Sequence, residues 1–417
     1  MSTVVPLPAA APAHADADGK ARDEASWAAA RFGIFLAGFS AFLGVYVTQP
    51  LLPMLQRIFA VSKAEAALTV SAPTVAVALA APFAGAIGAR LGHRRVIVGS
   101  LFLLSVPTLL AATATSMPAL VAWRFAQGLM VPGIYVVTVA LIAEEWPADG
   151  VGKATAAFVA GNVVGGFTGR LVAGLVAERG GWRAVFVVLG LLTVVTSYAA
   201  KRALPRARAP RRTAVRGGLG LGLLLEEPRL LATCAVGFNV LFTQVAIFTY
   251  VTFYLAAPPF RLGPAAISGI FVVYLVGAVV TPIAGRWIDR VGSRRAVSTA
   301  LGAAVLGGLL TLAHRLGWVE LGLAATCTAV FVSQSASTAF LRVVAPANAR
   351  SAAAGLYVSS YYLGGAVGGV LPAVAWHLGG WPACVALVAV LQLATIAVAW
   401  RFWRPARAIE RAASLAA

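Results

Sequence analysis

Twelve apolar segments, each about 20 residues long, recur along the 417-residue chain and constrain its fold more than any other feature. A segment of that length can cross the hydrocarbon layer of a membrane as a helix, and an open sheet edge is not tolerated there. Only 11% of the residues are charged, against about 25% in a soluble domain. The sequence therefore predicts an all-α integral membrane protein with twelve transmembrane helices. These are expected at residues 32–54, 67–89, 96–115, 118–143, 153–177, 182–202, 230–255, 264–285, 296–314, 318–343, 351–376 and 381–402.

The chain also repeats itself at an offset of 199 to 200 residues. Segment 85–95 joins two apolar segments and shares Gly, Arg, Gly, Arg and Arg in register with segment 285–295. The tripeptide Gly-Gly-Trp recurs at 180–182 and at 379–381. Two halves that repeat in the same orientation are typical of transporters whose substrate site lies between the halves near the middle of the membrane. We call segments 85–95 and 285–295 the twin loops.

The repeat divides the chain into two pseudo-repeated six-helix bundles. The N-terminal bundle is predicted at residues 31–202 and the C-terminal bundle at 230–403, with a basic cytoplasmic linker at 203–229 between them. Residues 1–30 are rich in Ala, Pro and Asp, which favours a disordered cytoplasmic tail, and residues 404–417 are expected to form a second tail.

The net charge of +19 reflects membrane topology rather than a nucleic-acid surface, because the cations lie at the ends of the apolar segments. With both termini in the cytoplasm, 25 of the 33 Lys and Arg residues fall on the cytoplasmic side and six fall outside. This bias predicts cytoplasmic termini by the positive-inside rule. The run from Lys201 to Arg216 holds seven cations and no acid. It either anchors the topology or contacts anionic lipid headgroups.

The sequence offers no cofactor, metal or catalytic site. Cys234, Cys327 and Cys384 all lie inside apolar segments, and no Cys/His cluster has the spacing of metal ligands. The expectation is therefore that the chain binds no cofactor or metal and is not an enzyme.

The second twin loop carries a known signature. It has the pattern Gly-x-x-x-Asp-Arg-x-Gly-x-Arg-Arg, met by Gly285, Asp289, Arg290, Gly292, Arg294 and Arg295. The first loop keeps this pattern except that Ala89 replaces the acid, and the fourth apolar segment carries Arg124-Phe-Ala-Gln-Gly128. These motifs resemble those of the major facilitator superfamily. Segments 46–53 and 161–170 further resemble the YnfM-type branch of bacterial exporters.

This resemblance implies a function and a location. It implies a monomeric secondary active transporter in the bacterial inner membrane, which moves a small organic solute by alternating access. It also implies proton-coupled efflux, and hence the lipid bilayer, the solute and protons as partners. None of the 14 acidic residues lies in the middle of a segment, whereas proton relays usually use buried carboxylates or histidines. An organic-anion carrier or facilitator that uses Arg124 and Arg170 is one alternative, and a non-transporting receptor or scaffold is another.

Polar side chains inside the apolar segments are the candidates for the substrate site. Arg124 and Arg170 each lie about seven residues from the outer end of a segment, roughly 10 Å deep. An intramembrane arginine normally faces a cavity or a partner. The alternatives are a structural arginine bonded to backbone carbonyls and, for the uncharged side chains, contacts between helices. The candidate cavity residues are Arg124, Gln127, Tyr135, Asn162, Arg170, Asn239, Gln334 and Tyr361.

The twin loops are the candidates for a gate at the cytoplasmic face. Their arginines and Asp289 are expected to form ion pairs or helix-end contacts that hold one half against the other in one state. The alternative is that the arginines only anchor the topology by the positive-inside rule. This alternative has more weight for the first loop, because that loop lacks the acid. The gating residues are expected to be Gly85, Arg90, Gly92, Arg94, Gly285, Asp289, Arg290, Gly292 and Arg294.

Overall fold

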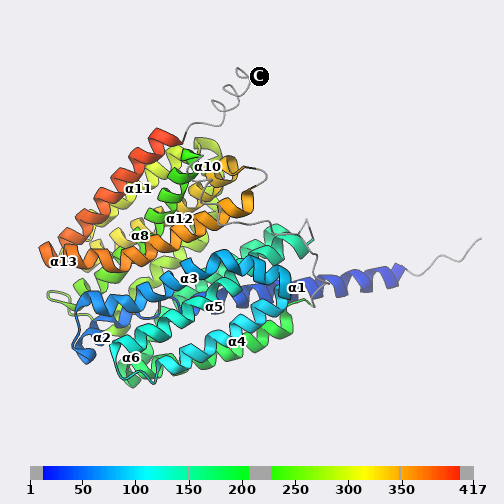
Figure 1. Ribbon diagram of the computed structural model, residues 1–417, viewed down its shortest axis with the longest axis horizontal. Helices are drawn as coiled ribbons and strands as arrows, with labels where there is room; N and C mark the ends of the chain where they lie inside the picture. Colours follow the sequence, from blue (N-terminus) through cyan, green and yellow to red (C-terminus); the bar gives the residue numbers. More distant parts are fainter. Residues whose placement is uncertain (1–12, 148–149, 206–226, 347–348, 404–417) are drawn as a thin grey trace, which may run out of the picture.

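The computed structural model describes residues 13–147, 150–205, 227–346 and 349–403, and within these ranges every regular element is a helix (Figure 1). The N-terminal bundle contains α1 (Ala13–Leu43), η1 (Gln49–Leu51), α2 (Leu52–Phe59), α3 (Lys63–Leu91), α4 (His93–Ala111), α5 (Met117–Glu145) and α6 (Val151–Ala203). The C-terminal bundle contains α8 (Pro228–Ala256), α9 (Pro264–Ile270), η2 (Phe271–Leu275), α10 (Val276–Val291), α11 (Ser293–Leu310), α12 (Leu316–Val344) and α13 (Arg350–Phe402).

These elements make up the twelve predicted membrane spans. Helices α6 and α13 each have 53 residues and bend at a glycine with positive φ, Gly181 in α6 and Gly380 in α13, so each supplies two spans. The eighth span runs through α9, η2 and α10. The first span is interrupted, because α1 ends at Leu43 and helix resumes only at η1 and α2. The prediction of an all-α fold with twelve helices in two six-helix bundles is confirmed.

The two bundles have matching architecture. In Figure 1 the blue and cyan helices lie in the lower part and the orange and red helices in the upper part. Helix α1 packs along α6 in the first bundle, and α8 packs along α13 in the second. Gly92 and Gly292 adopt nearly the same positive φ, 91° and 83°, at the joints of the twin loops. A residue with a side chain rarely adopts this conformation, so the repeated glycines fix the same sharp turn twice.

The predicted tail and linker differ from the structure in part. Helix α1 begins at Ala13, so residues 13–30, expected to be disordered, are helical and extend α1 beyond the bundle (Figure 1). Helix α6 continues to Ala203, and α8 begins at Pro228. Most of the basic linker, residues 206–226, and the second tail, 404–417, lie outside the described residues.

Glycines let the main helix pairs approach closely. A methyl group on Gly165 would lie 2.2 Å from the carbonyl oxygen of Phe39 in α1. In the second bundle, a methyl group on Gly364 would lie 2.0 Å from the carbonyl oxygen of Phe238 in α8. Small residues at helix contacts serve this purpose in membranes. The repeated glycines therefore bring α1 onto α6 and α8 onto α13.

We expect Gly165→Ala to destabilise the protein by about 1–3 kcal/mol, the usual range for overpacking. The added methyl group has no room, so α1 and α6 must separate. Gly85→Ala is the matched control, because a methyl group on Gly85 meets no described atom within 4 Å. The thermal unfolding midpoint of the purified protein measures both changes, and equal midpoints would contradict the tight contact.

Candidate functional site

A cavity of about 310 Å³ lies between the two bundles. Helices α1, α5 and α6 line one side, and α8, η2, α10, α12 and α13 line the other. Most of the lining is aromatic or polar without charge. The aromatic members are Phe42, Tyr46, Tyr135, Tyr274, Phe331, Tyr357, Tyr361 and Tyr362, and the polar members include Asn162, Gln244, Thr281, Gln334, Ser335 and Thr338. Arg170 is the one charged side chain among these lining residues.

Arg170 lies at the junction between the two bundles and is only 2% exposed. Its Nε donates to Oε1 of Gln49 at 2.8 Å, and one Nη donates to the carbonyl of Gly166 at 2.7 Å. The guanidinium carbon lies 4.4 Å from the ring centroid of Tyr274 and 5.0 Å from that of Phe271, both in η2. Cation–π contacts of this kind stabilise a desolvated cation. Within the described part of the chain, the other Nη has no hydrogen-bond partner and no carboxylate pairs with Arg170.

Four other candidates also line the cavity. Tyr135 comes from α5, Asn162 from α6, Gln334 from α12 and Tyr361 from α13. Gln334 accepts a hydrogen bond from Tyr357 at 3.3 Å, which orients both side chains. The structure thus brings five of the eight candidates, Arg170 included, to one cavity.

Arg124 does not line this cavity, which corrects the expectation that it forms a cavity wall. The side chain is fully buried, and its Nε donates to the carbonyl of Thr69 at 2.9 Å. Its Nη groups donate to the carbonyls of Gly44 and Val45 and to Oε1 of Gln127. These carbonyls are available because the first span is interrupted after Leu43. Arg124 therefore supplies hydrogen-bond donors to the carbonyls of the broken span. This is the alternative of a structural arginine bonded to backbone carbonyls.

Gln127 and Asn239 are also absent from the cavity lining. Gln127 accepts from Arg124 and donates to Thr108 at 3.0 Å, so it joins α5 to α4. Asn239 donates to the carbonyl of Leu391 at 2.8 Å and to Thr395 at 2.6 Å, which joins α8 to α13. Both side chains connect helices within one bundle, because each accepts from a residue of its own helix and donates to a neighbouring helix.

Four residues around Arg170 were not expected from the sequence, and one of them is Tyr46, whose ring centroid lies 4.9 Å from the guanidinium carbon. Gln49, Phe271 and Tyr274 lie in short 3₁₀ elements, where helical periodicity gives no guide to their direction. One signal was available for Gln49. It stands 200 residues before Thr249, at the repeat offset, and Gln49 Nε2 donates to Thr249 Oγ1 at 3.1 Å. The hydrogen bond thus joins equivalent positions of the two halves.

The twin loops are fastened to their own bundles. Arg94 donates to the carbonyls of Lys201 and Leu204 at the end of α6, at 2.6 and 3.2 Å. The equivalent Arg294 stacks over the ring of Trp400 near the end of α13, at 4.4 Å. Arginine near a helix C-terminus also interacts favourably with the helix dipole. Both arginines therefore hold the last helix of their own bundle, which differs from the expected contact between halves.

The other gating candidates make no ion pair within the described ranges. Arg90, Asp289 and Arg290 are exposed. A methyl group added to Gly85 or Gly285 would meet no described atom within 4 Å, so neither glycine marks a close helix contact. The expected ion-pair latch through Asp289 is thus not formed by the described residues in this conformation.

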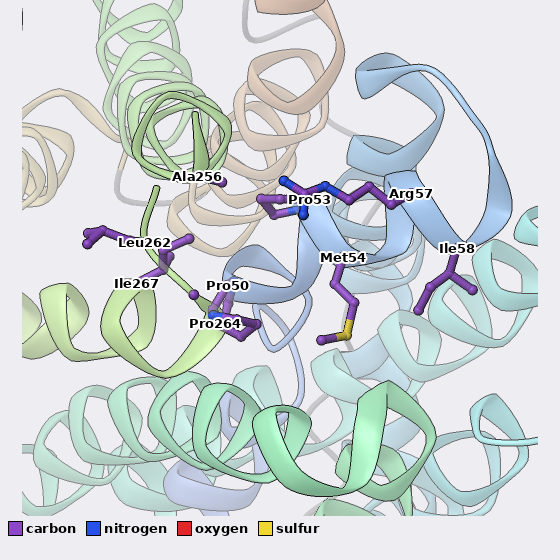
Figure 2. A pocket seen from close by; sticks show the side chains of 10 residues that line it. Pro50, Pro53, Met54, Arg57, Ile58, Ala256, Leu262, Pro264 and Ile267 are labelled. Carbon is purple, nitrogen blue, oxygen red and sulfur yellow. The ribbon is translucent and has the colours of Figure 1, made fainter. Parts of the chain in front are cut away.

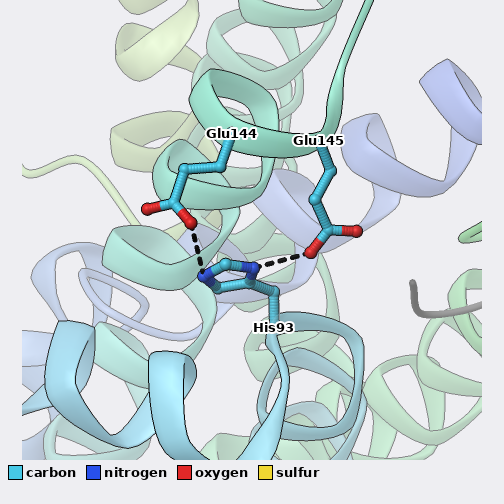
Figure 3. Close-up of polar contacts among 3 residues, drawn as sticks. All are labelled: His93, Glu144 and Glu145. Carbon is cyan, nitrogen blue, oxygen red and sulfur yellow. Dashed lines mark hydrogen bonds and ion pairs between the residues drawn. The ribbon is translucent and has the colours of Figure 1, made fainter. Parts of the chain in front are cut away.

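A small charged cluster belongs to the first twin loop alone. His93 Nδ1 lies 2.7 Å from Glu145 Oε1, and Nε2 lies 3.7 Å from Glu144 Oε2 (Figure 3). The repeat-equivalent of His93 in the second loop is Ser293. These contacts tie the start of α4 to the end of α5, so the first loop is additionally fixed to its neighbour.

A second crevice, of about 230 Å³, lies at the opposite end of the molecule from the twin loops. Figure 2 shows Pro50, Met54 and Arg57 of the first bundle facing Leu262 and Pro264 of the second. Its lining is apolar apart from Arg57, and it is more remote from the middle of the spans than the central cavity. We call this end the η1 end.

Sequence comparison identifies the family. The chain matches the Major Facilitator Superfamily over residues 34–369 and, in a second match, over residues 259–417. It belongs to this superfamily. The chain is therefore a multi-pass membrane transporter, and the fold implied by the loop motifs is confirmed.

Relatives and solved structures agree with this assignment. The chain is 28% identical to the MFS-type transporter YybF of Bacillus subtilis, over 88% of this chain and 91% of that protein. It is 28% identical to the inner membrane transport protein YnfM of Escherichia coli, over 89% of each. The solved structure of the nucleoside transporter NupG matches with a TM-score of 0.73, 13% identity and coverage of 90% of this chain and all of that one. A bacterial homologue of the lysosomal transporter Spinster gives a TM-score of 0.69 at 14% identity, covering 89% and 93%.

Proposed function

We propose that this superfamily member carries a small organic anion with an aromatic or apolar body across the bacterial inner membrane by alternating access. The observation that carries the proposal is Arg170, a buried cation in the cavity with no carboxylate partner in the described chain. Burial of an unpaired charge is costly, and an anionic ligand offsets that cost. A cationic solute would meet repulsion there.

The rest of the lining supports a solute with an apolar body. Ligand sites combine apolar and aromatic surface with a few polar groups that fix orientation. Tyr46 and Tyr274 flank the guanidinium of Arg170, and Tyr361 and Gln334 also line the cavity. An anion bound at Arg170 would therefore place its body against tyrosine rings.

The conformation supports an alternating-access cycle. The bundles meet at the η1 end through the Gln49–Thr249 hydrogen bond and through Arg170 against the η2 rings. The charge bias of the sequence favours a cytoplasmic position for the twin loops. In this orientation the η1 end is periplasmic, and we interpret the conformation as one whose periplasmic end is shut.

Proton-coupled efflux, which the sequence resemblance implies, is not part of this proposal. The YnfM relative is named an inner membrane transport protein, which supports the location. The cavity lining, as far as the structure describes it, contains no carboxylate or histidine to relay protons. Exchange of anions, or flux down their own gradient, accounts for this lining without a proton site.

Flux measurements in proteoliposomes test the proposal. Benzenesulfonate is the probe, because it stays ionised and leaks slowly, and benzenesulfonamide is its neutral control. We expect protein-dependent flux of the anion and not of the amide, with little change when a pH gradient is imposed. Equal flux of both compounds would exclude an anion site, and strict dependence on the pH gradient would instead establish proton coupling.

The role of the twin loops as a gate remains a prediction for another state of the cycle. We expect Asp289→Asn to lower transport more than Ala89→Asp, because Asp289 is the one acid in either loop. Asp289 is exposed and forms no ion pair with the described residues, so we expect stability to change by less than about 0.5 kcal/mol. Flux and thermal midpoint of both variants are the measurements, and equal losses of flux would remove the asymmetry between the loops.

A further inference from the structure

Among the described residues, Gln49 is the one side chain that contacts both the cavity arginine and the opposite bundle through hydrogen bonds. Its Oε1 accepts from Arg170 Nε at 2.8 Å, while its Nε2 donates to Thr249 Oγ1 of α8 at 3.1 Å. Gln49 and Thr249 are 1% and 0% exposed, so water does not compete for this bond. Arg170 therefore orients the amide that joins the two halves.

Two cations also contact aromatic rings of the opposite bundle at the η1 end. The Lys63 ammonium lies 5.8 Å from the ring centroid of Phe253 and 5.3 Å from that of Trp376, and Arg170 lies over the η2 rings. Among the described residues, Gln49–Thr249 is the one side-chain hydrogen bond between the halves at this end.

The other close contacts at the η1 end involve small residues, such as Gly174, on which a methyl group would lie 2.4 Å from the carbonyl of Pro264. Such packed surfaces can slide or separate as rigid bodies. A buried hydrogen bond between the halves then favours the closed arrangement, and its loss favours opening.

The edge of Arg170 formed by Nε and the Nη that bonds to no described residue is where an anion would bind. Side-on recognition of a carboxylate or sulfonate uses the Nε and the neighbouring Nη together. The amide oxygen of Gln49 occupies the Nε position, whereas the carbonyl of Gly166 occupies the other end of the guanidinium. The Gly166 carbonyl belongs to the same helix as Arg170 and cannot move away easily, but the Gln49 side chain can rotate. A two-point anion would thus displace Gln49.

We propose that Gln49 links occupancy of the cavity to opening of the η1 end: an anion that takes the Nε edge of Arg170 displaces the Gln49 amide, which then releases Thr249. The displacement is favoured because a charged acceptor binds guanidinium more strongly than a neutral amide. This step rests on the proposed anion site. The closure by Gln49 and Thr249 does not, so the two parts are separable by experiment.

Two variants give different signatures. Thr249→Val removes the bond between the halves but leaves Gln49 on Arg170, so it should ease opening and change anion affinity only through that opening. Gln49→Ala removes both bonds, so it should ease opening and also tighten anion binding, because the competitor is gone. Thr252→Val is the matched control, since Thr252 is equally buried on α8 but its hydroxyl donates within that helix, to the carbonyl of Thr249.

Opening is measured by the rate at which a small maleimide labels Ser268→Cys, a buried position on the contact between α9 and α6. The native cysteines are buried, and the chain without the added cysteine gives the background. Loss of one buried hydrogen bond should raise the labelling rate about three- to tenfold in Gln49→Ala and Thr249→Val. An unchanged rate in both, or the same increase in Thr252→Val, would overturn the closure.

Affinity is measured by calorimetric titration with benzenesulfonate. We expect Gln49→Ala to bind benzenesulfonate about three- to tenfold more tightly than Thr249→Val does. Both variants lose the bond between the halves, so the difference between their affinities reports only the loss of Gln49 as a competitor for Arg170. Added benzenesulfonate should also speed labelling of the otherwise unmodified chain. Equal affinities in the two variants would overturn the displacement. Absence of binding in every variant would overturn the anion site and the displacement together, while the labelling rates still decide whether Gln49 and Thr249 close the η1 end.

Discussion

Arg170→Gln is expected to weaken benzenesulfonate binding roughly 10- to 100-fold and to abolish its measurable flux, because hydrogen bonds to a charged group contribute about 1.5–3 kcal/mol. Arg170 is the one charged residue in the described cavity lining, so no neighbouring cation there replaces it. Arg170→Lys should give an intermediate loss, since it keeps the charge but lacks the planar pair of donors.

The control for this result is Arg179→Gln. Arg179 lies on the same helix, α6, but is exposed and does not line the cavity. Its loss removes the same charge without changing the site. Titration calorimetry and proteoliposome flux measure all three variants, with the thermal midpoint as a check of folding. A folded Arg170→Gln protein that binds the anion as tightly as Arg179→Gln would remove Arg170 from the site.

Arg124→Met is expected to lower stability by about 2–5 kcal/mol, because it leaves two buried carbonyls without the donors that Arg124 supplies, at about 1–3 kcal/mol each, and weakens the bonding of a third. The affected carbonyls are those of Gly44, Val45 and Thr69, of which that of Gly44 keeps a long bond from the Val47 amide at 3.4 Å. The first two belong to the interruption of the first span, where the helical hydrogen-bond ladder is broken. The apparent thermal midpoint should fall by roughly 10 °C.

The second readout distinguishes a structural arginine from a ligand contact. Protein that remains folded in Arg124→Met should bind benzenesulfonate as the unmodified chain does, because Arg124 does not line the cavity. Arg124→Lys should recover part of the stability, since an ammonium has three donors. An unchanged thermal midpoint would contradict the role of Arg124 in the broken span, and a selective loss of affinity would return it to the substrate site.

Arg124 and Arg170 show how far the sequence could go with the candidate site. Both lie at similar depth in neighbouring spans, and composition does not tell them apart. Their roles diverge because of backbone geometry elsewhere. The interruption after Leu43 presents carbonyls to Arg124, whereas Arg170 meets the rings of η2 and the amide of Gln49. A sequence pattern that assumes unbroken helices predicts neither environment.

The twin loops show the same limit at the surface. Their glycines were identified from the repeat, and the matching φ values of Gly92 and Gly292 explain why glycine stands at both joints. The partners of their arginines were not predictable. Arg94 and Arg294 reach the ends of α6 and α13, which lie more than 100 residues away along the chain.

The sequence by itself determined the membrane class, the twelve spans, the two repeated halves and the superfamily. These follow from local apolar length and from motifs that recur in register, and neither requires knowledge of contacts between distant segments. Only the tertiary structure decided which buried polar side chains face the cavity and which bond to a neighbouring helix. That choice depends on helix rotation and on breaks such as the one before Gln49. A side chain's direction is set by how whole helices pack, and single-segment patterns do not encode it.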